Sequence, residues 1–452
     1  MAADLIASTD NRVVVGLGAT GVSCARHLYR AGLKFSVVDT RRNPPGLAAL
    51  QQEMPDVAVF AGDYPQELIT GASELVVSPG VALDTPLVET ARTAGVSVIG
   101  DIDIFVREAQ APVVGITGSN AKSTVTELVG QMATDAGLNA GVGGNLGPPA
   151  LDLLSPARDI YVLELSSFQL ERADNLDLAV ATVLNVSADH LDRHKTMVAY
   201  HQAKHRIFRG CRAAVVNAGD ALTTPLVPPD VEIVSWRMSE PQLGGFGLRM
   251  LKGQEHLCRG FESIMPVAEL AMAGRHNVAN ALAALALGNC VGLPVASMVQ
   301  TLRRFSGLPH RCQWVGEVQG VSFVNDSKGT NVGATRAALA GLGAQRNIVL
   351  IAGGQGKGAD FVPLKSEVGL HCKAVVLIGE DAPLLQEALA GAAPVERAAS
   401  MQEAVVAAAA LAGSGDTVLL SPACASFDMF SGYEQRGDVF CAAVNALAGG
   451  TR

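Results

Sequence analysis

The chain has 452 residues, of which 49% are hydrophobic and 17% are charged. This composition allows a large core and excludes a disordered protein, and the length predicts about three domains. The formal net charge of −9 argues against nucleic acid or an anionic membrane as a partner, because both are negatively charged. An acidic protein that binds phosphate must therefore use individual loops and single Lys or Arg residues.

The cysteines and the N-terminus indicate the compartment. The eight cysteines are scattered without a CxxC pair, which favours free thiols in a reducing cytosol over disulfides or zinc. The first twelve residues lack the basic stretch and the apolar run of a signal peptide. Residues 277–302 carry no charge, but Gly292 and Pro294 interrupt them, so we expect a buried helix and turn instead of a membrane span.

A βαβ pattern opens the chain. Arg12–Gly16 predicts a buried strand, the motif GLGATG (Gly16–Gly21) begins a helix, and the strand Phe35–Val38 ends in Asp39. A GxGxxG turn in this setting is typical of a dinucleotide site, so NAD or FAD binding is the default interpretation. The alternative is a different nucleotide, bound by the same helix N-terminus and by the residues from Asp39 onward.

A second αβ series contains a phosphate-binding loop. The strand-like run Val113–Ile116 leads into GSNAKST (Gly118–Thr124), and a helical pattern follows. In such a loop the backbone N–H groups face the phosphates, Lys122 reaches the β- and γ-phosphates, and Ser123 can ligate Mg²⁺. Ala121 stands where these loops usually have glycine, and its Cβ is tolerable only if its φ stays below zero.

Two further strands of this series bring polar groups to the same edge. Ile160–Leu165 contains Glu164 near its end, and Ala179–Val186 leads to His190. The carboxyl ends of parallel strands are where open α/β sheets bind ligands. Beside the phosphate loop, Glu164 and His190 therefore predict a Mg²⁺ site, although Mg²⁺ prefers oxygen and the imidazole is the less expected ligand.

The rest of the chain continues the αβ pattern. Residues 141–147 predict a Gly-rich turn that holds Asn145, and residues 234–266 predict a few antiparallel strands. Asn277 and Asn280 are expected one turn apart on one face of an Ala-rich helix. Further strands are expected at residues 321–325, 347–352, 374–378 and 417–420, and a last helix at about residues 434–447.

Seven motifs occur in a fixed order along the chain. They are GITGSNAKST (115–124), ELSSFQL (164–170), NVSADHLD (185–192), GRHNVAN (274–280), GLPHR (307–311), NDSKGTN (325–331) and SPACAS (421–426). Together they resemble the Mur ligases, the ATP-dependent amino-acid ligases of peptidoglycan precursor synthesis, over essentially the whole chain. The ELSSFQL and SPACASFD versions are similar to those of D-glutamate-adding members, and Ala121 is the departure, because the family usually has glycine there.

The resemblance implies an α/β protein of three domains. These are a Rossmann-like UDP-substrate-binding domain (1–101), a central P-loop ATPase-like parallel sheet that binds ATP (102–308) and a Rossmann-like amino-acid-binding domain (309–452). It implies ATP-dependent addition of D-glutamate to UDP-N-acetylmuramoyl-L-alanine, through an acyl phosphate, by a cytoplasmic monomer without nucleic-acid or membrane partners. The implied cofactors are ATP, two Mg²⁺ ions and a carbamylated Lys204.

The resemblance also implies roles for single residues. UDP-substrate binding is expected from Thr20, Asp39, Thr40, Arg41, Gly80, Asn145 and Ser166. ATP binding is expected from Gly118, Asn120, Lys122, Ser123, Thr124, Asn277, Asn280, Arg311 and Asp326. D-Glutamate is expected at Lys328, Thr330, Lys357, Ser426 and Tyr433, where the family has a phenylalanine-like residue at the last position. Metal ligation is expected from Ser123, Glu164, His190 and Lys204, and catalytic roles from Lys122, His190 and Lys204.

Physical chemistry agrees with the implied modification of Lys204. An ammonium group beside Mg²⁺ is repelled, whereas a carbamate turns the same side chain into an anionic oxygen ligand. Other interpretations are another Mur-type or folylpolyglutamate-type ligase, an NAD-dependent oxidoreductase built on Gly16–Gly21, or a non-catalytic nucleotide-binding regulator. The oxidoreductase leaves Lys122, Ser123 and Glu164 without a role.

Overall fold

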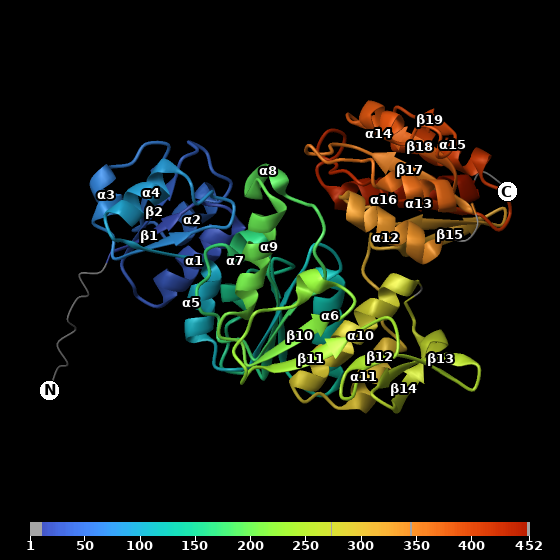
Figure 1. Ribbon diagram of the computed structural model, residues 1–452. Coiled ribbons are helices and arrows are strands. Elements are labelled where there is room, and N and C mark those ends of the chain that lie inside the picture. Colours follow the sequence, from blue (N-terminus) through green and yellow to red (C-terminus); the bar gives the residue numbers. More distant parts are fainter. Residues whose placement is uncertain (1–10, 273, 344–345, 450–452) are drawn as a thin grey trace.

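The computed structural model describes residues 11–272, 274–343 and 346–449, and within these ranges the chain forms three sheets, each with its own helices (Figure 1). The first part (blue) and the last part (orange to red) lie on either side of α8 (Leu191–His194) and α9 (Met197–His205) in this view. The expected α/β architecture is thereby confirmed. The predicted domain boundaries after residues 101 and 308 stay a prediction. The expectation that the N-terminus lacks a signal peptide concerns mainly residues 1–10, which lie outside the described residues.

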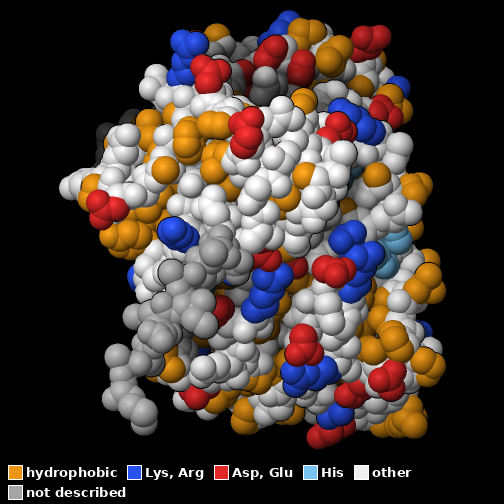
Figure 2. All heavy atoms as spheres, turned by 90° about the vertical axis from the view of Figure 1, so that its left-hand side faces the viewer, with side chains coloured by type: hydrophobic (Ala, Val, Ile, Leu, Met, Phe, Trp, Pro, Cys, Tyr) orange, Lys and Arg blue, Asp and Glu red, His pale blue; other side chains and the backbone are white. Residues whose placement is uncertain are grey.

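The first sheet is parallel, with the strand order β3-β2-β1-β4-β5. Its strands are β1 (Arg12–Val15), β2 (Phe35–Asp39), β3 (Ala58–Ala61), β4 (Glu74–Val77) and β5 (Ser97–Ile99). Its helices are α1 (Ala19–Arg30), α2 (Leu47–Glu53), α3 (Gln66–Thr70) and α4 (Pro86–Thr93), and α5 (Asp101–Glu108) leads onward. Runs of valine suit the central strands because both faces of a parallel sheet are buried. On the face shown in Figure 2, basic and acidic side chains are interspersed.

The second sheet has the order β14-β13-β12-β11-β10-β9-β6-β8-β7. Its strands are β6 (Val113–Thr117), β7 (Ala140–Gly144), β8 (Ile160–Glu164), β9 (Val180–Val183), β10 (Ala213–Asn217), β11 (Glu232–Trp236), β12 (Phe246–Leu251), β13 (Gln254–Arg259) and β14 (Glu262–Pro266). Besides α8 and α9, its helices are α6 (Lys122–Asp135), α7 (Ser167–Leu170), α10 (Arg275–Cys290) and α11 (Val295–Leu302), with the 3₁₀ turns η1 (Ala150–Leu153), η2 (Arg206–Phe208), η3 (Ala221–Thr223) and η4 (Val267–Glu269).

Two sequence predictions in this sheet were partly wrong. Residues Gly141–Gly144 do not form a turn but lie in the edge strand β7, which pairs with β8. A Cβ at Gly143 would lie 2.4 Å from the carbonyl oxygen of Pro148, so the strand needs glycine for close packing and not for turning. The strand β11 pairs in parallel with β10, and among the described strands of this sheet only the β12–β13 and β13–β14 pairs are antiparallel.

The third sheet has the order β15-β16-β20-β17-β18-β19, with only its β15–β16 pair antiparallel among the described strands. Its strands are β15 (Gln313–Val318), β16 (Val321–Asn325), β17 (Ile348–Gly353), β18 (Cys372–Ile378), β19 (Val395–Arg397) and β20 (Thr417–Leu420). Its helices are α12 (Val332–Leu342), α13 (Leu364–His371), α14 (Ala382–Ala388), α15 (Met401–Leu411) and α16 (Tyr433–Gly449). Four strands, β16, β17, β18 and β20, match the predicted ones to within two residues, whereas β15 and β19 were not predicted.

The uncharged stretch 277–302 forms a buried helix and a turn, as expected, and a second helix that was not predicted. It is divided between α10 and α11, and most of α10 is buried against α6 and the second sheet. Within the described residues, no helix has both the length and the apolar character needed to cross a bilayer.

From the sequence, the φ of Ala121 was expected to stay below zero, and this expectation was wrong. Ala121 is the N-cap of α6 and has a φ of 67° and a ψ of −5°, which is the left-handed region. A left-handed conformation costs an L-residue about 1–2 kcal/mol because its Cβ crowds the following carbonyl oxygen. The methyl group packs against the core of the second sheet, and this contact offsets part of that cost.

Replacing Ala121 by glycine is therefore expected to stabilise the fold. Relief of the left-handed strain exceeds the extra backbone entropy of glycine, so Ala121→Gly should raise the free energy of unfolding by about 1 kcal/mol. Ala136→Gly, at the right-handed C-cap of the same helix (φ −79°), is the matched control and should lower it. Denaturant unfolding measures both, and destabilisation by Ala121→Gly would contradict the strain argument.

Candidate active site

Five of the seven residues expected to bind the UDP substrate line a cavity of about 680 Å³ at the carboxyl edge of the first sheet, whereas Asn145 and Ser166 line a different cavity. The predicted residues in its wall are Thr20, Asp39, Thr40, Arg41 and Gly80. Burial would raise the pKa of Asp39, but the Arg41 guanidinium and the N–H groups of Leu17 and Arg41 outweigh it and lower that pKa. The buried hydroxyl of Thr85, a residue that is also in the wall, has no hydrogen-bond partner among the described residues.

A second cavity, of about 460 Å³, lies between the central and the C-terminal parts. The predicted residues in its wall are Asn120, Lys122, Ser123, Asn145, Glu164, Ser166, His190, Lys204, Arg311, Lys328, Thr330, Lys357, Ser426 and Tyr433. They come from the carboxyl ends of β6 and β8, from the segments around α8 and α9, and from loops of the third part. Residues separated by about three hundred positions in sequence therefore share one enclosed space.

Glu164 is the buried carboxylate of this cavity. Its Oε2 accepts a hydrogen bond of 2.5 Å from the hydroxyl of Ser123, and its Oε1 accepts one of 2.6 Å from the amide of Asn145. The guanidinium of Arg311, in the C-terminal part, donates to Ser123 Oγ at 2.6 Å. The end of the phosphate loop is thus connected to the third part through a single hydroxyl.

Two lysines share one acceptor at this site. Lys122 Nζ donates to the carbonyl oxygens of Gly118 (2.9 Å) and Ser119 (3.0 Å), and Lys204 Nζ donates to Gly118 at 2.7 Å. Lys204 is only 2% exposed, and its Nζ lies 4.5 Å from the ring centroid of Tyr200. Burial lowers the pKa of both lysines, and the positive charge of Lys122 contributes to holding the pKa of Lys204 well below its usual value. Gly118 thus contributes its carbonyl oxygen to the site.

His190 lies at the start of α8 with a left-handed backbone (φ 53°). Its ring packs edge-on against Phe168, with the centroids 4.9 Å apart, and burial lowers its pKa. The neighbouring Asp189 accepts a hydrogen bond of 3.1 Å from Asn331, whose amide also donates to Asn120 at 3.2 Å. This contact is a second connection between the central part and the third.

The C-terminal side of the cavity is rich in cations and hydroxyls. Lys328 places its ammonium group 3.8 Å from the centroid of the Tyr433 ring, and burial lowers the pKa of Lys328 to about 8. Thr330, Lys357 and Ser426 line the same wall. Such a set of groups can bind carboxylates.

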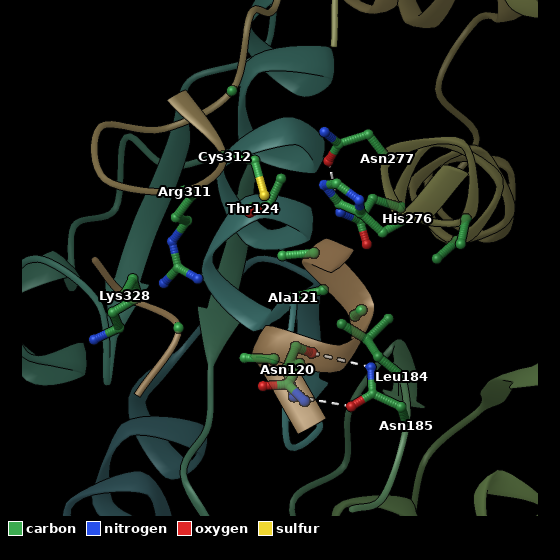
Figure 3. Close-up of a pocket in the computed structure, with 18 of the residues that line it drawn as sticks. Asn120, Ala121, Thr124, Leu184, Asn185, His276, Asn277, Arg311, Cys312 and Lys328 are labelled. Carbon is green, nitrogen blue, oxygen red and sulfur yellow. Dashed lines mark hydrogen bonds between the residues drawn. The ribbon is translucent and has the colours of Figure 1, made fainter. Parts of the chain in front are cut away.

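A third cavity, of about 230 Å³, adjoins the phosphate loop (Figure 3). The predicted residues in its wall are Asn120, Thr124, Asn277, Asn280, Arg311 and Asp326. Asn280 donates to Asn277 at 3.0 Å, as their spacing on α10 predicts. In Figure 3, Arg311 and Lys328 lie on one side of Ala121, and His276 and Asn277 lie on the other. Apolar walls with a few amides suit a planar base.

Sequence reasoning missed several residues that line these cavities. Tyr200 could have been found, because it lies four positions before Lys204 and hence on the same face of α9. Asp189 and Asn331 lie inside recognised motifs, but nothing in the sequence shows that they contact each other. Trp236 and His276 border the third cavity through tertiary packing alone.

Comparisons with known proteins agree with this geometry. The chain matches three family models, described as the Mur ligase MurD-like N-terminal domain (residues 10–100), the Mur ligase middle domain (116–288) and the Mur ligase glutamate ligase domain (310–424). A UDP-N-acetylmuramoylalanine–D-glutamate ligase of Pseudomonas aeruginosa is 56% identical over 98% of this chain and 100% of that protein. A protein of the same name from Nitrosococcus oceani is 52% identical over 96% of both.

Solved structures share the fold at much lower identity. The UDP-N-acetylmuramate–alanine ligase MurC of Thermotoga maritima has a TM-score of 0.58 at 18% identity, covering 96% of this chain and 99% of that one. The MurF ligase of Thermotoga maritima in complex with ADP has a TM-score of 0.59 at 15% identity, covering 97% of this chain and 96% of that one.

Asp326 gives the site a measurable pH dependence. Burial raises its pKa to about 6, although hydrogen bonds from Ser421 and the Cys312 N–H oppose this rise. Since the pKa in the folded state exceeds the unfolded value of 3.8, the stabilisation from protonated Asp326 is complete below pH 4 and is lost as pH rises through 6. Relative to Asp326→Asn, the wild type should lose about 3 kcal/mol of unfolding free energy over this interval. A pH series of denaturant titrations tests this, and a pH-independent difference would contradict it.

Proposed function

The chain belongs to the Mur ligase family, and from this premise we propose that it joins D-glutamate to UDP-N-acetylmuramoyl-L-alanine, with ATP hydrolysis, in peptidoglycan precursor synthesis. Identities of 52–56% over nearly full length with ligases of that name support the proposal. The observation that carries it is the second cavity, where Lys122, Ser123 and Glu164 of the central part face the cations and hydroxyls of the third part.

The three cavities would divide the substrates between them, and the reacting groups would meet in the second cavity. The first cavity, at the switch in strand order between β1 and β4, would hold the UDP group through Thr20, Asp39, Thr40, Arg41 and Gly80. The third would hold adenosine, and its contact with the phosphate loop would direct the triphosphate into the second. The second would hold the muramoyl-peptide end near Asn145, Ser166 and His190 and D-glutamate near Lys328, Thr330, Lys357, Ser426 and Tyr433.

Amide formation from a carboxylate requires a leaving group. Transfer of the γ-phosphoryl group of ATP to the L-alanyl carboxylate gives an acyl phosphate and ADP. The D-glutamate amine then attacks the acyl carbon, and phosphate leaves as the amide bond forms and the nitrogen loses a proton. Positioning and electrostatics carry most of such a barrier, and the enclosed cavity keeps water away from the acyl phosphate.

The chain's own cations would offset the negative charge of the transferring group. Lys122 and Arg311 lie at the phosphate loop. Lys122 donates hydrogen bonds to the carbonyl oxygens of Gly118 and Ser119, and Arg311 donates one to the hydroxyl of Ser123. On the opposite wall, Lys328 and Lys357 would orient the carboxylates of D-glutamate, which leaves its amine to face the acyl carbon.

The donor set near Glu164 fits Mg²⁺. The hydroxyl of Ser123 and the carboxylate of Glu164 are hard oxygen donors in contact with each other, and His190 and a carbamylated Lys204 would add ligands for a second ion. When bound, Mg²⁺ would neutralise phosphate charge.

The surroundings of Lys204 suit carbamylation. A neutral amine can attack CO₂ through its nitrogen lone pair, forming an N–C bond and losing one proton to give a carbamate. Burial and the charge of Lys122 lower the pKa of Lys204 and so favour the neutral amine that this reaction requires, and the product anion would lie beside Lys122. We also propose that the enzyme is cytoplasmic, in line with the eight free cysteines, and that it is a monomer.

The proposed reaction is tested by phosphate release. Release from ATP should require both UDP-N-acetylmuramoyl-L-alanine and D-glutamate, and omission of either substrate should reduce it to background. A panel of other amino acids separates this activity from that of another Mur-type or folylpolyglutamate-type ligase. Turnover with a different amino acid and none with D-glutamate would overturn the specificity, and nicotinamide binding in the first cavity would favour an oxidoreductase.

Loss of the Lys204 amine should abolish most turnover. Lys204→Ala is expected to lower kcat by about 10²-fold or more, because the anionic carbamate cannot form, and CO₂ depletion should slow the wild type in the same direction. Added short-chain carboxylates should restore part of the activity of the variant. Full activity of Lys204→Ala together with indifference to CO₂ would refute carbamylation.

A further inference from the structure

We infer that Arg193 is a positioning residue that couples occupancy of the UDP-substrate cavity to the placement of His190. The inference rests on the function proposed for the first cavity, and it adds a physical connection between that cavity and the second. The connection consists of a backbone carbonyl of the first part, one guanidinium and one aromatic ring.

The connection begins at Val81. Val81 lines the first cavity directly after Gly80, and its carbonyl oxygen accepts hydrogen bonds from two arginines of the central part. Arg172 Nη2 donates at 2.7 Å and Arg193 Nη2 at 3.1 Å. The loop that borders the proposed UDP site is therefore bonded to the neighbouring part of the molecule.

The two arginines differ in what else they contact. Arg172 has no exposed side-chain surface, donates to the carbonyl oxygen of Phe168 and also donates to Glu171 at 3.3 Å, so it is part of the packed interface. Arg193 is 19% exposed, pairs with the carboxylate of Glu171 and places its Cζ 5.3 Å from the centroid of the Phe168 ring. The same ring packs against His190, with 4.9 Å between centroids.

The segment that carries His190 needs such an anchor. Helix α8 is only one turn long, and the residues at its two ends, His190 and Lys195, have left-handed φ values of 53° and 64°. Strained backbone of this kind persists only where surrounding contacts hold it. The ring of His194 contacts the hydroxyl of Ser167 at 2.9 Å on one side, and Arg193 supplies the connection to Val81 on the other.

Ligand binding in the first cavity would restrict the Val81 loop. Since Arg193 lies three residues after His190 and is bonded to that loop, the restriction reaches α8 and the Phe168 ring and fixes the imidazole. Coupling between sites is reciprocal, so weakening this connection should affect both UDP-substrate binding and the rate of the step near His190.

The experiment compares Arg193→Ala with Arg193→Lys and with a closely matched control. Arg249 has the same side-chain exposure of 19%, donates to the carbonyl oxygen of Gly260 at 3.0 Å and lies 4.7 Å from the Phe261 ring. It also pairs with Glu240 at 3.6 Å, and these partners all lie within residues 240–261. Arg249→Ala therefore removes an equivalent set of contacts without touching either cavity. Arg193→Lys keeps the charge but not the two-pronged donor group.

In steady-state assays, Arg193→Ala should lower kcat/KM for UDP-N-acetylmuramoyl-L-alanine by about tenfold or more, as expected for loss of a charge-assisted hydrogen-bond set. KM for ATP should change by less than about twofold, Arg193→Lys should be intermediate, and Arg249→Ala should match the wild type. Equal losses in Arg249→Ala, or equal changes in KM for all substrates, would show a general structural effect and overturn the inference.

A binding measurement separates this inference from the proposed reaction. In protein with isotope-labelled histidine, UDP alone should shift the His190 ring resonance in the wild type and in Arg249→Ala, but not in Arg193→Ala. A resonance that UDP fails to move in the wild type, or moves equally in Arg193→Ala, refutes the coupling. If the wild type lacks ligase turnover, the proposed function fails, and the titration still decides the coupling.

Discussion

Two lysine side chains, Lys122 and Lys204, donate hydrogen bonds to the carbonyl oxygen of Gly118, and this pair of neighbouring basic groups determines the local charge of the second cavity. Burial of Lys204 is the main reason why its pKa falls well below the usual value, and repulsion from the positive charge of Lys122 adds to the effect. Glu164 is the nearby carboxylate that balances them, together with Asp189. The protein has a formal net charge of −9, yet the wall of this cavity brings together the basic side chains of Lys122, Lys204, Arg311, Lys328 and Lys357.

The fold serves this site by placing the carboxyl ends of the central and C-terminal sheets opposite each other. Glu164 ends β8, and the phosphate loop follows β6, while Asp326 directly follows β16. Neither part forms the cavity alone, because the Arg311–Ser123 and Asn331–Asp189 hydrogen bonds cross between them. The first part remains attached at its own edge through the carbonyl of Val81, which leaves its cavity open to a separate ligand.

Sequence patterns predicted those features of the fold that depend on residues close together in the sequence. Valine-rich runs identified the buried strands, and polar residues such as Glu164 were correctly expected at the carboxyl ends of parallel strands. The errors concern backbone geometry set by tertiary contacts: the left-handed Ala121, the glycines of β7 and the parallel pairing of β11. The Arg193–Val81 contact joins residues 112 positions apart, and no local pattern in either segment indicates it.

Backbone strain gathers where these parts meet. Besides Ala121 and His190, the residues with positive φ include Lys195 after α8, His310 and Cys312 beside Arg311, Lys357 in the cavity wall and Ala423 in the SPACAS motif. These are seven of the eleven such non-glycine residues in the described part, and the other four are Asp177, Lys252, Gln319 and Arg346. Each such conformation in a non-glycine residue costs free energy that the rest of the fold must supply. Strained residues in turns far from the site would not contribute to one function. Strained residues in the loops that meet at the site hold side chains in place before any substrate binds. A reaction that depends on positioning a phosphoryl group, a carboxylate and an amine benefits from this preorganisation, because less ordering remains to be done on binding.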